Sequence, residues 1–220
     1  AQGSYANNTN IRQNSDIDVC IMLTSTVFLD YPDGKTREDY GYSEGSIEYS
    51  TYKKYIISAL KQKFGSDQIY EGNKCINISS NTYHVNADVI PAFQYRDYKS
   101  INSQHANNYI EGIKYISRTG SEIRNYPKKH ISNSKEKNIN TNHEYKKLVR
   151  IMKHIRKEMV DAKLVDEDII SSFLVECLVW NIPNSTITRR NTWSETVKDS
   201  ILFLSDALNN DNCKYWGEVS

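Results

Sequence analysis

The sequence has few cysteines, no long apolar run and almost no excess of either charge. Its four cysteines, at positions 20, 75, 177 and 213, form no C-x-x-C pair, so neither a zinc knuckle nor a disulfide framework is indicated. No run approaches about 18 apolar residues and no basic-then-apolar leader opens the chain, so no membrane span or secretory signal is predicted and we expect a cytoplasmic location. The net charge is only +1, which argues against a dedicated binder of long duplex nucleic acid.

Residue alternation predicts a sheet in the first half of the chain. Residues 16–23 alternate between apolar and other side chains, which predicts a strand with at least one thoroughly buried face and with Asp16 and Asp18 together on the other face. A helix is predicted over 46–64 from apolar residues at helical spacing. Further strands are predicted over 75–78 and 83–90, and we expect Pro91 to end the second because proline cannot donate to a strand ladder.

The second half is predicted to begin with loops and to continue as helices. Residues 102–142 are rich in Ser, Asn, Lys and Gly, so loops are expected there around a short helical stretch near 109–116. Apolar spacing predicts helices over 145–159, over 169–182 with a stop at Pro183, and over 193–208. Thr192 and Glu195 have the T-x-x-E spacing of a helix N-terminus. The predicted fold class is α+β, with a mixed sheet first and helices after it.

Three acidic residues carry the main chemical signal. Asp16 and Asp18 would project from one strand face with their stems about 6 to 7 Å apart. Asp88 faces away from the apolar residues of its own predicted strand, so the three carboxylates converge if the two strands pair. Such oxygen donors suit Mg²⁺ or Mn²⁺, and two ions can activate an attacking hydroxyl and neutralise a leaving pyrophosphate. His84 shares the face of Asp88 and could orient it, but no histidine is predicted to be catalytic.

A Gly-Ser pair stands upstream of these acids. Gly3 would allow the backbone to approach a phosphate closely, and the Ser4 hydroxyl would add a donor to its oxygens. Both Gly-Ser and D-x-D are common in surface loops, so each is weak by itself. Their order, followed by a lone Asp on a later strand, is specific. The alternative is that the three acids are exposed residues at strand ends.

These motifs resemble those of a known family. Gly3-Ser4-Tyr5-Ala6, Thr9-Asn10-Ile11-Arg12 and Ser15-Asp16-Ile17-Asp18-Val19 resemble the signature of the polymerase-beta-type nucleotidyltransferase superfamily. Later segments make the chain similar to the bacterial cGAS/DncV-like nucleotidyltransferases over nearly its whole length. These segments are Asn125-Tyr126-Pro127-Lys128-Lys129-His130, Lys137-Asn138, residues 146–153 and residues 171–176.

The resemblance implies a bilobed fold with the active site in a cleft. Residues 1–125 would form the catalytic core with a palm-like sheet, and residues 126–220 a helical lobe that closes the nucleotide cleft. The implied activity is template-independent synthesis of cyclic di- or trinucleotide messengers from nucleoside triphosphates such as ATP, with two Mg²⁺ or Mn²⁺ ions per site, in antiphage defence (CBASS). A separate effector protein would read the product. The zinc insertion of the animal relatives is missing, so no DNA activator is implied.

The resemblance also implies a long helix before Gly3 and further helices after Ser220, so we expect the sequence to cover part of the natural chain. It matches Lys153 to a lysine that contacts donor phosphates, Ser172 to a serine that assists it, and Phe173 to an aromatic residue that stacks on a base. The residues themselves leave other interpretations open. Phe173 has the spacing of a packed helix, and a solvated face would explain the basic stripe of Lys146, Arg150, Lys153 and Lys157.

Two other functions remain open at this stage. The same superfamily contains enzymes that tail RNA without a template, so an RNA nucleotidyltransferase is the first alternative. The near-neutral charge and the lack of an evident RNA-binding appendage disfavour it. A non-catalytic nucleotide-binding relative is the second alternative, and the presence of all three acids counts against it.

Overall fold

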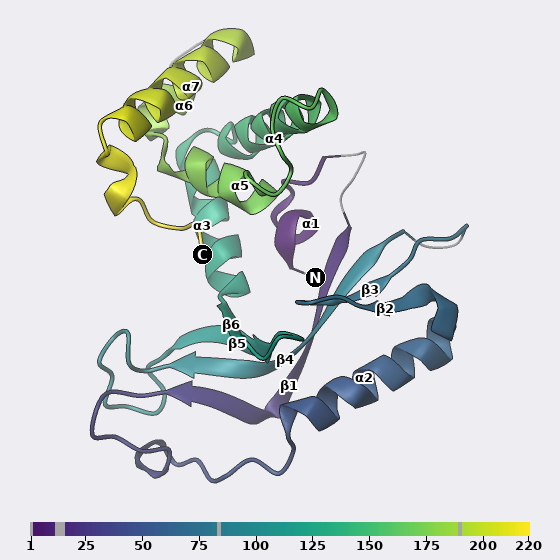
Figure 1. The fold of residues 1–220 in the computed structure, drawn as a ribbon. Coiled ribbons are helices and arrows are strands. Elements are labelled where there is room, and N and C mark those ends of the chain that lie inside the picture. Colours follow the sequence, from purple (N-terminus) through teal and green to yellow (C-terminus); the bar gives the residue numbers. More distant parts are fainter. Residues whose placement is uncertain (1, 12–15, 83–84, 189–190) are drawn as a thin grey trace. The chain divides into compact units, whose positions relative to one another are not determined.

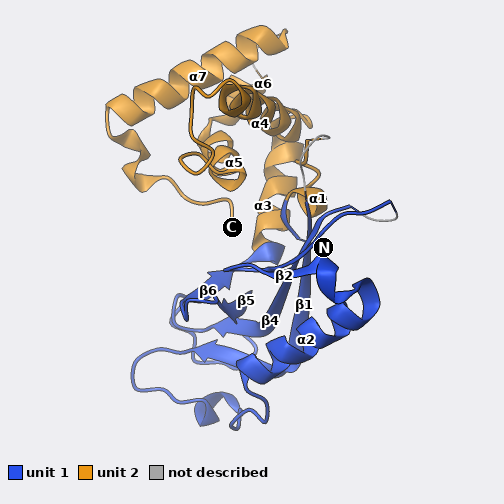
Figure 2. Ribbon diagram, turned by 45° about the vertical axis from the view of Figure 1, so that its right-hand side comes forward, with its two compact units in different colours: residues 1–3, 16–128 blue, residues 4–15, 129–220 orange. Residues whose placement is uncertain are grey.

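A computed structural model describes residues 2–11, 16–82, 85–188 and 191–220 and shows two compact units. Unit 1 consists of Ala1–Gly3 and Asp16–Lys128, and unit 2 of Ser4–Ser15 and Lys129–Ser220 (Figure 2). The predicted boundary between residues 125 and 126 falls close to the end of unit 1. Segment 4–15, which the sequence analysis placed in the sheet half, groups instead with the helices.

Unit 1 is built on a six-stranded mixed sheet (Figure 1). Five strands follow the order β2-β3-β4-β5-β6 with antiparallel neighbours, and β1 lies parallel to β4. The predicted α+β class with a mixed sheet is therefore confirmed. The strands are β1 (Ile17–Asp30), β2 (Ile69–Glu71), β3 (Ile76–Ile78), β4 (Ala87–Asp97), β5 (Ile110–Ile116) and β6 (Glu122–Asn125).

The first strand is longer and more exposed than predicted. Its register with β4 shifts between Leu23 and Val27, and it continues to Asp30. Residues 17–23 are half-buried, so the expectation of one thoroughly buried face was wrong. The physical reason is position: among the described strands β1 pairs with β4 alone, which leaves its other edge outside the sheet.

Pro91 does not end the fourth strand, which was also an error of prediction. β4 continues to Asp97 and pairs with β1 along its whole length. On its other edge β3 pairs with residues 87–89 and β5 with residues 93–97, which leaves a gap at Pro91. The Pro91 carbonyl accepts a hydrogen bond from the Tyr49 hydroxyl at 3.0 Å. Because the N–H and C=O of a strand residue share an edge, the missing N–H of Pro91 faces this gap and no ladder bond is lost.

Segment 102–142 is mostly regular structure, contrary to prediction. It forms β5, β6 and the helix α3 (Pro127–Asn140), and residues 110–116 are strand, not helix. Its polar residues are accommodated by specific pairing. Lys114 is buried in β5 and forms an ion pair with Glu122 of β6 at 2.8 Å. α3 buries His130 and Ser134, so it lacks the apolar stripe by which a helix is recognised.

Helix α2 (Tyr49–Phe64) packs on the sheet of unit 1 and confirms the helix predicted over 46–64. Tyr49 and Tyr52 are buried in a cluster around Phe93. The Tyr52 hydroxyl donates to the Ile21 carbonyl at 2.9 Å, so the helix is joined to β1 by a hydrogen bond as well as by apolar packing. Gly65, at φ 95°, ends the helix in a conformation that favours glycine.

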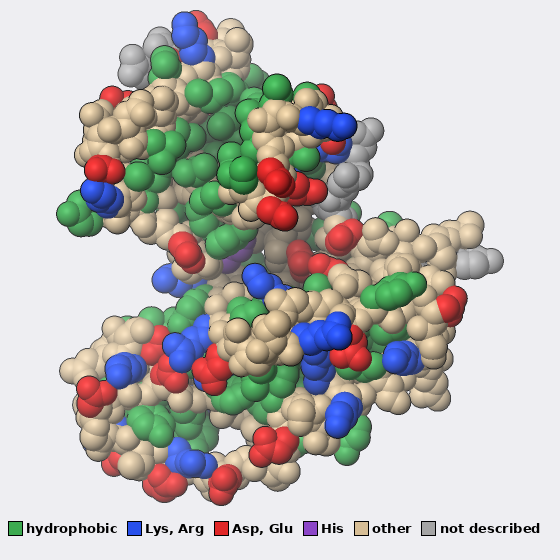
Figure 3. Space-filling view, in the orientation of Figure 1, with side chains coloured by type: hydrophobic (Ala, Val, Ile, Leu, Met, Phe, Trp, Pro, Cys, Tyr) green, Lys and Arg blue, Asp and Glu red, His purple; other side chains and the backbone are tan. Residues whose placement is uncertain are grey.

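Unit 2 is helical, as predicted. Its core gathers Tyr145, Leu148 and Val149 with apolar residues of the later helices. Its helices are most of α3, together with α4 (Tyr145–Asp161), α5 (Ser172–Asn181), α6 (Asn184–Thr188) and α7 (Trp193–Asn209), and the short α1 (Gly3–Asn7) begins where the chain passes from unit 1 to unit 2. On the face drawn in Figure 3, hydrophobic side chains gather over this unit. In the described part of the chain, no helix is long and apolar enough to cross a membrane.

The helix ends in unit 2 follow local signals. The Ser171 hydroxyl accepts a hydrogen bond from the Leu174 amide at 3.1 Å, so α5 begins three residues later than predicted. The predicted cap of α7 is confirmed, since the Thr192 hydroxyl accepts from the Glu195 amide at 3.3 Å. The Glu195 carboxylate accepts from the Thr192 hydroxyl at 2.8 Å.

Candidate active site

Two of the three predicted carboxylates lie side by side in unit 1. Asp18 of β1 and Asp88 of β4 are register partners in the parallel pair. Paired residues of neighbouring strands project from the same face of a sheet, and the strands lie about 4.8 Å apart. Both side chains are half-buried. The convergence of Asp18 and Asp88 predicted from the strand pattern therefore exists in the structure.

A third polar residue extends this row and was missed in the sequence. Asn77 of β3 is the register partner of Asp88 on its other side, and its Nδ2 donates to Asp88 Oδ1 at 2.6 Å. Asn77 also donates to the Cys75 sulfur at 3.4 Å. The sequence indicates Asn77 only by its position between two isoleucines, Ile76 and Ile78. Both isoleucines are buried in β3. The row Asp18, Asp88 and Asn77 crosses three strands.

The thiols near this row are protonated in ordinary conditions. Burial, together with the charge of the neighbouring Asp88 carboxylate, raises the pKa of Cys75 to about 11. Burial also raises the pKa of Cys20 to about 11. The four cysteines are free thiols, as the sequence predicted. Since a thiolate is the reactive form, neither Cys20 nor Cys75 is a candidate nucleophile.

Gly3 lies so close to Asp18 that any other residue at this position would have to displace the Asp18 side chain. A Cβ atom added to Gly3 would lie 1.9 Å from Asp18 Oδ2, and Gly3 has a φ of +67°. The adjacent Gln2 amide donates to the Asp18 carbonyl at 3.0 Å, which fixes the start of the chain along β1. The glycine therefore allows the backbone and the Asp18 carboxylate to lie close together, and its predicted contact with a substrate phosphate stays a prediction.

Asp16 precedes β1 directly and is exposed. Among the residues that the structure places, no group of three or more His, Cys, Asp and Glu side chains is close enough to hold a metal ion. Asp16 therefore is not gathered with Asp18 and Asp88 into a preformed site. The hard carboxylate oxygens of the Asp18 and Asp88 pair nevertheless fit Mg²⁺ or Mn²⁺ chemically. The prediction for His84 lies outside the described residues.

A cavity of about 160 Å³ lies in unit 1 along the same strand face. Cys20 and Met22, which follow Asp18 at a spacing of two, line it. The cavity wall is mainly apolar. Two of its lining residues, Lys128 and Glu111, form an ion pair, with Nζ 2.7 Å from Oε1. The remaining lining residues are Gln2, Gly112, Ile113 and Pro127.

In unit 2, Lys153 is buried and paired, so it does not belong to a solvated helix face. Its side chain is 4% exposed, and its Nζ lies 3.0 Å from Glu176 Oε2. The basic stripe on α4 does not act as one surface: Arg150 donates to the Asn8 carbonyl at 2.7 Å, and Lys157 pairs with Asp161. The interpretation of this stripe as a solvated face was therefore wrong for Lys153.

Glu176 is the centre of a buried polar cluster that sequence analysis did not identify. Its Oε2 accepts from the Thr9 hydroxyl at 3.0 Å, and its Oε1 lies 2.8 Å from His130 Nε2. Burial by itself would raise the pKa of Glu176, but the hydrogen bond from His130 and the charge of Lys153 lower it to about 2. Glu176 is therefore ionised. No charge pattern along the chain brings residues 9, 130, 153 and 176 together.

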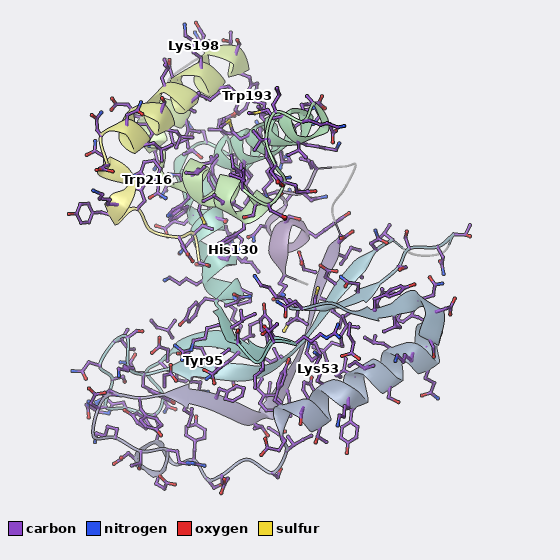
Figure 4. The ribbon with its side chains drawn as sticks, viewed as in Figure 1. Lys53, Tyr95, His130, Trp193, Lys198 and Trp216 are labelled. Atoms are coloured by element: carbon purple, nitrogen blue, oxygen red, sulfur yellow. The ribbon has the colours of Figure 1, made fainter. Side chains whose placement is uncertain are left out.

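The other predicted nucleotide contacts are accessible. Ser172 is exposed at the start of α5, and Phe173 is 41% exposed. The Phe173 ring meets the His130 ring edge to face, with centroids 5.6 Å apart. Phe173 is therefore not a core residue, contrary to the packing interpretation. His130 comes from α3 (Figure 4). Ser4 is half-buried, and its carbonyl accepts from the Thr9 amide at 2.9 Å.

Comparison with known proteins places these features in a family. Residues 132–220 match the family model of the cGAS/DncV-like nucleotidyltransferase C-terminal helical domain. A cyclic dipyrimidine nucleotide synthase CdnE of Cecembia lonarensis is 42% identical over 220 residues, which are 100% of this chain and 73% of that protein. A cyclic GMP-AMP synthase CdnE03 of Staphylococcus schleiferi is 42% identical over 207 residues, which are 94% of this chain and 64% of that protein.

Solved structures agree with this comparison. The Rhodothermus marinus CdnE c-UMP-AMP synthase with Apcpp and Upnpp matches with a TM-score of 0.83 and 30% identity, over 94% of this chain and 68% of that one. The Elizabethkingia meningoseptica CdnE cyclic dinucleotide synthase with GTP and Apcpp matches with a TM-score of 0.80 and 31% identity, over 99% of this chain and 72% of that one. With its paired carboxylates, its Gly-Ser segment and these relatives, the chain belongs to the cGAS/DncV-like nucleotidyltransferases.

Proposed function

We propose that the protein joins nucleoside triphosphates into cyclic di- or trinucleotides without a template. The observation that carries this proposal is the pairing of Asp18 with Asp88 across β1 and β4, with Gly3 pressed against Asp18. The names of the relatives, which are cyclic nucleotide synthases, support the same reaction. Phosphoryl transfer needs positioned charge more than a covalent nucleophile, and the protonated thiols are consistent with this.

The carboxylates would hold the divalent metal that this family uses. We assign Asp18 and Asp88 as ligands, and propose that the exposed Asp16, two residues before Asp18, completes the set when substrate binds. Two Mg²⁺ or Mn²⁺ ions would supply the charge that neutralises the α-phosphate and the leaving pyrophosphate. Asn77 holds one oxygen of Asp88, which restricts the rotation of this carboxylate.

The remaining chemistry concerns the substrate itself. The 3′-hydroxyl of one nucleotide would lose its proton near Asp88 and attack the α-phosphate of the other, which then releases pyrophosphate. Gly3 and Ser4 would contact the triphosphate through the backbone amide and the hydroxyl, assisted by Lys153 and Ser172. Phe173 presents an exposed ring on which a base can stack, for about 1 to 3 kcal/mol. The apolar cavity beside Cys20 and Met22 has the chemistry to receive a second base.

The cellular role follows from the product. We propose that the protein works in bacterial antiphage signalling (CBASS), that a separate effector reads the cyclic product, and that no DNA activator is needed. A cytoplasmic site of action is consistent with nucleoside triphosphate substrates and with four free thiols. An RNA-tailing enzyme and a non-catalytic binder remain the alternatives.

One experiment separates these three functions. The full-length protein is incubated with labelled ATP, GTP, CTP and UTP and with Mg²⁺ or Mn²⁺, first without and then with RNA, and the products are treated with alkaline phosphatase and analysed by mass spectrometry. Short phosphatase-resistant products support the proposal. Extension of added RNA alone would identify a tailing enzyme, and no product under any condition would identify a binder.

A further inference from the structure

One buried carboxylate in unit 2 touches or supports several of the groups proposed to bind the triphosphate. Glu176 is 1% exposed and lies on α5, three residues after Phe173 and four after Ser172. Side chains at these spacings share one face of a helix. Its partners come from three other segments: Thr9 from the N-terminal segment, His130 from α3 and Lys153 from α4.

Each partner leads to one proposed substrate contact. Lys153 is itself such a contact, and its Nζ lies 3.0 Å from Glu176 Oε2 and 3.5 Å from Thr9 Oγ1. Thr9 is linked to Ser4, since the Thr9 amide donates to the Ser4 carbonyl at 2.9 Å. Glu176 therefore contacts both Lys153 and Thr9, and the Thr9 amide is in turn hydrogen-bonded to Ser4.

The third link leads to the aromatic ring. His130 Nε2 lies 2.8 Å from Glu176 Oε1, so the carboxylate fixes the orientation of the imidazole. The edge-to-face contact of His130 with Phe173, at an interplanar angle of 81°, then limits the positions of the exposed ring. A rotation of the imidazole would remove the surface against which Phe173 rests.

Such a cluster is an unusual way to fill a core. Removing two charges from water is costly, and apolar residues of the same volume often stabilise a protein equally well or better. The cluster does what an apolar core does not: directional hydrogen bonds fix the relative positions of three segments that are far apart in the sequence. All of these contacts lie within unit 2.

We propose that Glu176 is a positioning residue that pre-organises Ser4, Lys153 and Phe173 for a nucleoside triphosphate. It does not touch the substrate and acts through Thr9, through His130 and on Lys153 directly. The proposal rests on the nucleotide-binding function proposed above. It predicts that loss of the carboxylate charge weakens triphosphate binding more than it slows the chemical step, because Asp18 and Asp88 belong to unit 1 and are unchanged.

The test compares Glu176→Gln and Thr9→Val with the control Glu136→Gln, which changes an exposed residue of α3. Glutamine keeps the size of Glu176 and loses its charge, and valine keeps the shape of Thr9 and loses the hydroxyl. Calorimetry measures the Kd of a methylene-bridged ATP analogue with Mg²⁺, at a temperature where circular dichroism shows each protein to be folded. Steady-state assays give KM and kcat separately.

We expect Glu176→Gln to raise the Kd and KM roughly tenfold, which corresponds to about 1.4 kcal/mol, with kcat changed by less than about threefold. Thr9→Val should raise Kd roughly threefold by itself and add little to Glu176→Gln, because both act through one hydrogen bond. Glu136→Gln should bind like wild type.

The outcomes distinguish the two proposals. Wild-type protein that does not bind the analogue would overturn the nucleotide function, and this inference with it. Wild-type binding together with unchanged Kd and KM in folded Glu176→Gln would overturn only the positioning role. If Glu176→Gln does not fold, Thr9→Val decides: a Kd equal to wild type refutes the inference, and a raised Kd with preserved kcat supports it.

Discussion

The acidic residues of the two units are used in opposite ways. In unit 1, Asp18 and Asp88 are half-buried neighbours with like charge, accompanied by the neutral Asn77. In unit 2, Glu176 is almost fully buried and lies against Lys153 and His130. Two adjacent carboxylates offer the hard oxygen donors that a divalent metal ion prefers. A carboxylate that is already compensated by the protein's own donors organises the structure around it.

The largest expected effect is on turnover, and it tests the pair of Asp18 and Asp88 in unit 1. Asp88→Asn removes a charge that we assign to metal binding and leaves the side-chain volume unchanged. We expect turnover to fall at least about a thousandfold, roughly 4 kcal/mol in the activation free energy, with an unchanged circular dichroism spectrum. The control Asp33→Asn changes an exposed acid that pairs with Lys99, and it should retain full activity. Near-normal turnover in Asp88→Asn would refute the assignment.

The next effect is on the free energy of unfolding, and it tests Glu176, which is paired with Lys153. Lys153→Met leaves Glu176 buried without its ammonium partner, so we expect a loss of about 3 to 5 kcal/mol in the free energy of unfolding, measured by urea denaturation. Lys147→Met is the matched control on the same helix, because Lys147 is about half exposed and pairs with Glu144. That variant should unfold like wild type. A loss below about 1 kcal/mol in Lys153→Met would mean that the pair is weakly coupled.

The pH dependence of stability gives a smaller and more specific effect. The pKa of Glu176 is about 2 in the folded protein, against an ordinary value of 4.5. Because the folded pKa is the lower one, this stabilisation is present above about pH 4.5 and is lost as the pH falls toward 2. Wild type should therefore lose about 3 kcal/mol more than Glu176→Gln between pH 4.5 and pH 2. Parallel pH profiles of the two proteins would contradict this.

The smallest effect is on kcat, and it tests whether Asn77 holds the Asp88 carboxylate in position. Asn77→Ala removes the hydrogen bond of 2.6 Å to Asp88 Oδ1, so the carboxylate gains rotational freedom. We expect kcat to fall roughly tenfold, about 1.4 kcal/mol, in the range of one hydrogen bond to a charged group. Asn107→Ala, in an exposed loop, is the control. A kcat equal to that of the control would show that Asp88 is positioned without Asn77.

Local patterns were sufficient for several elements. The helices α2, α4 and α7 have apolar residues at regular spacing and recognisable ends, such as Gly65 and Thr192, and all three were predicted. Asp18 and Asp88 were predicted to converge because alternation along a strand determines which face a side chain occupies. The family assignment also followed from short motifs, and the comparisons confirm it.

Predictions failed where distant partners decide the outcome. Lys114 lies buried in a strand where a short helical stretch was predicted, and its ammonium forms an ion pair with Glu122 of the next strand. Pro91 lies inside β4 because the neighbouring edge is open at that point. Neither fact has a local signal, since composition and periodicity describe only a residue's own segment.

The amino-acid sequence by itself indicated the family, the candidate residues Asp18 and Asp88, and the strand face on which each of them lies. Only the tertiary structure decided which of them meet. Asp18 and Asp88 became neighbours through a parallel strand pair, and Lys153 became a buried partner of Glu176 instead of an exposed cation. The physical reason is that strand pairing and burial of charge depend on contacts between segments many residues apart, whose free energies are not encoded by local spacing.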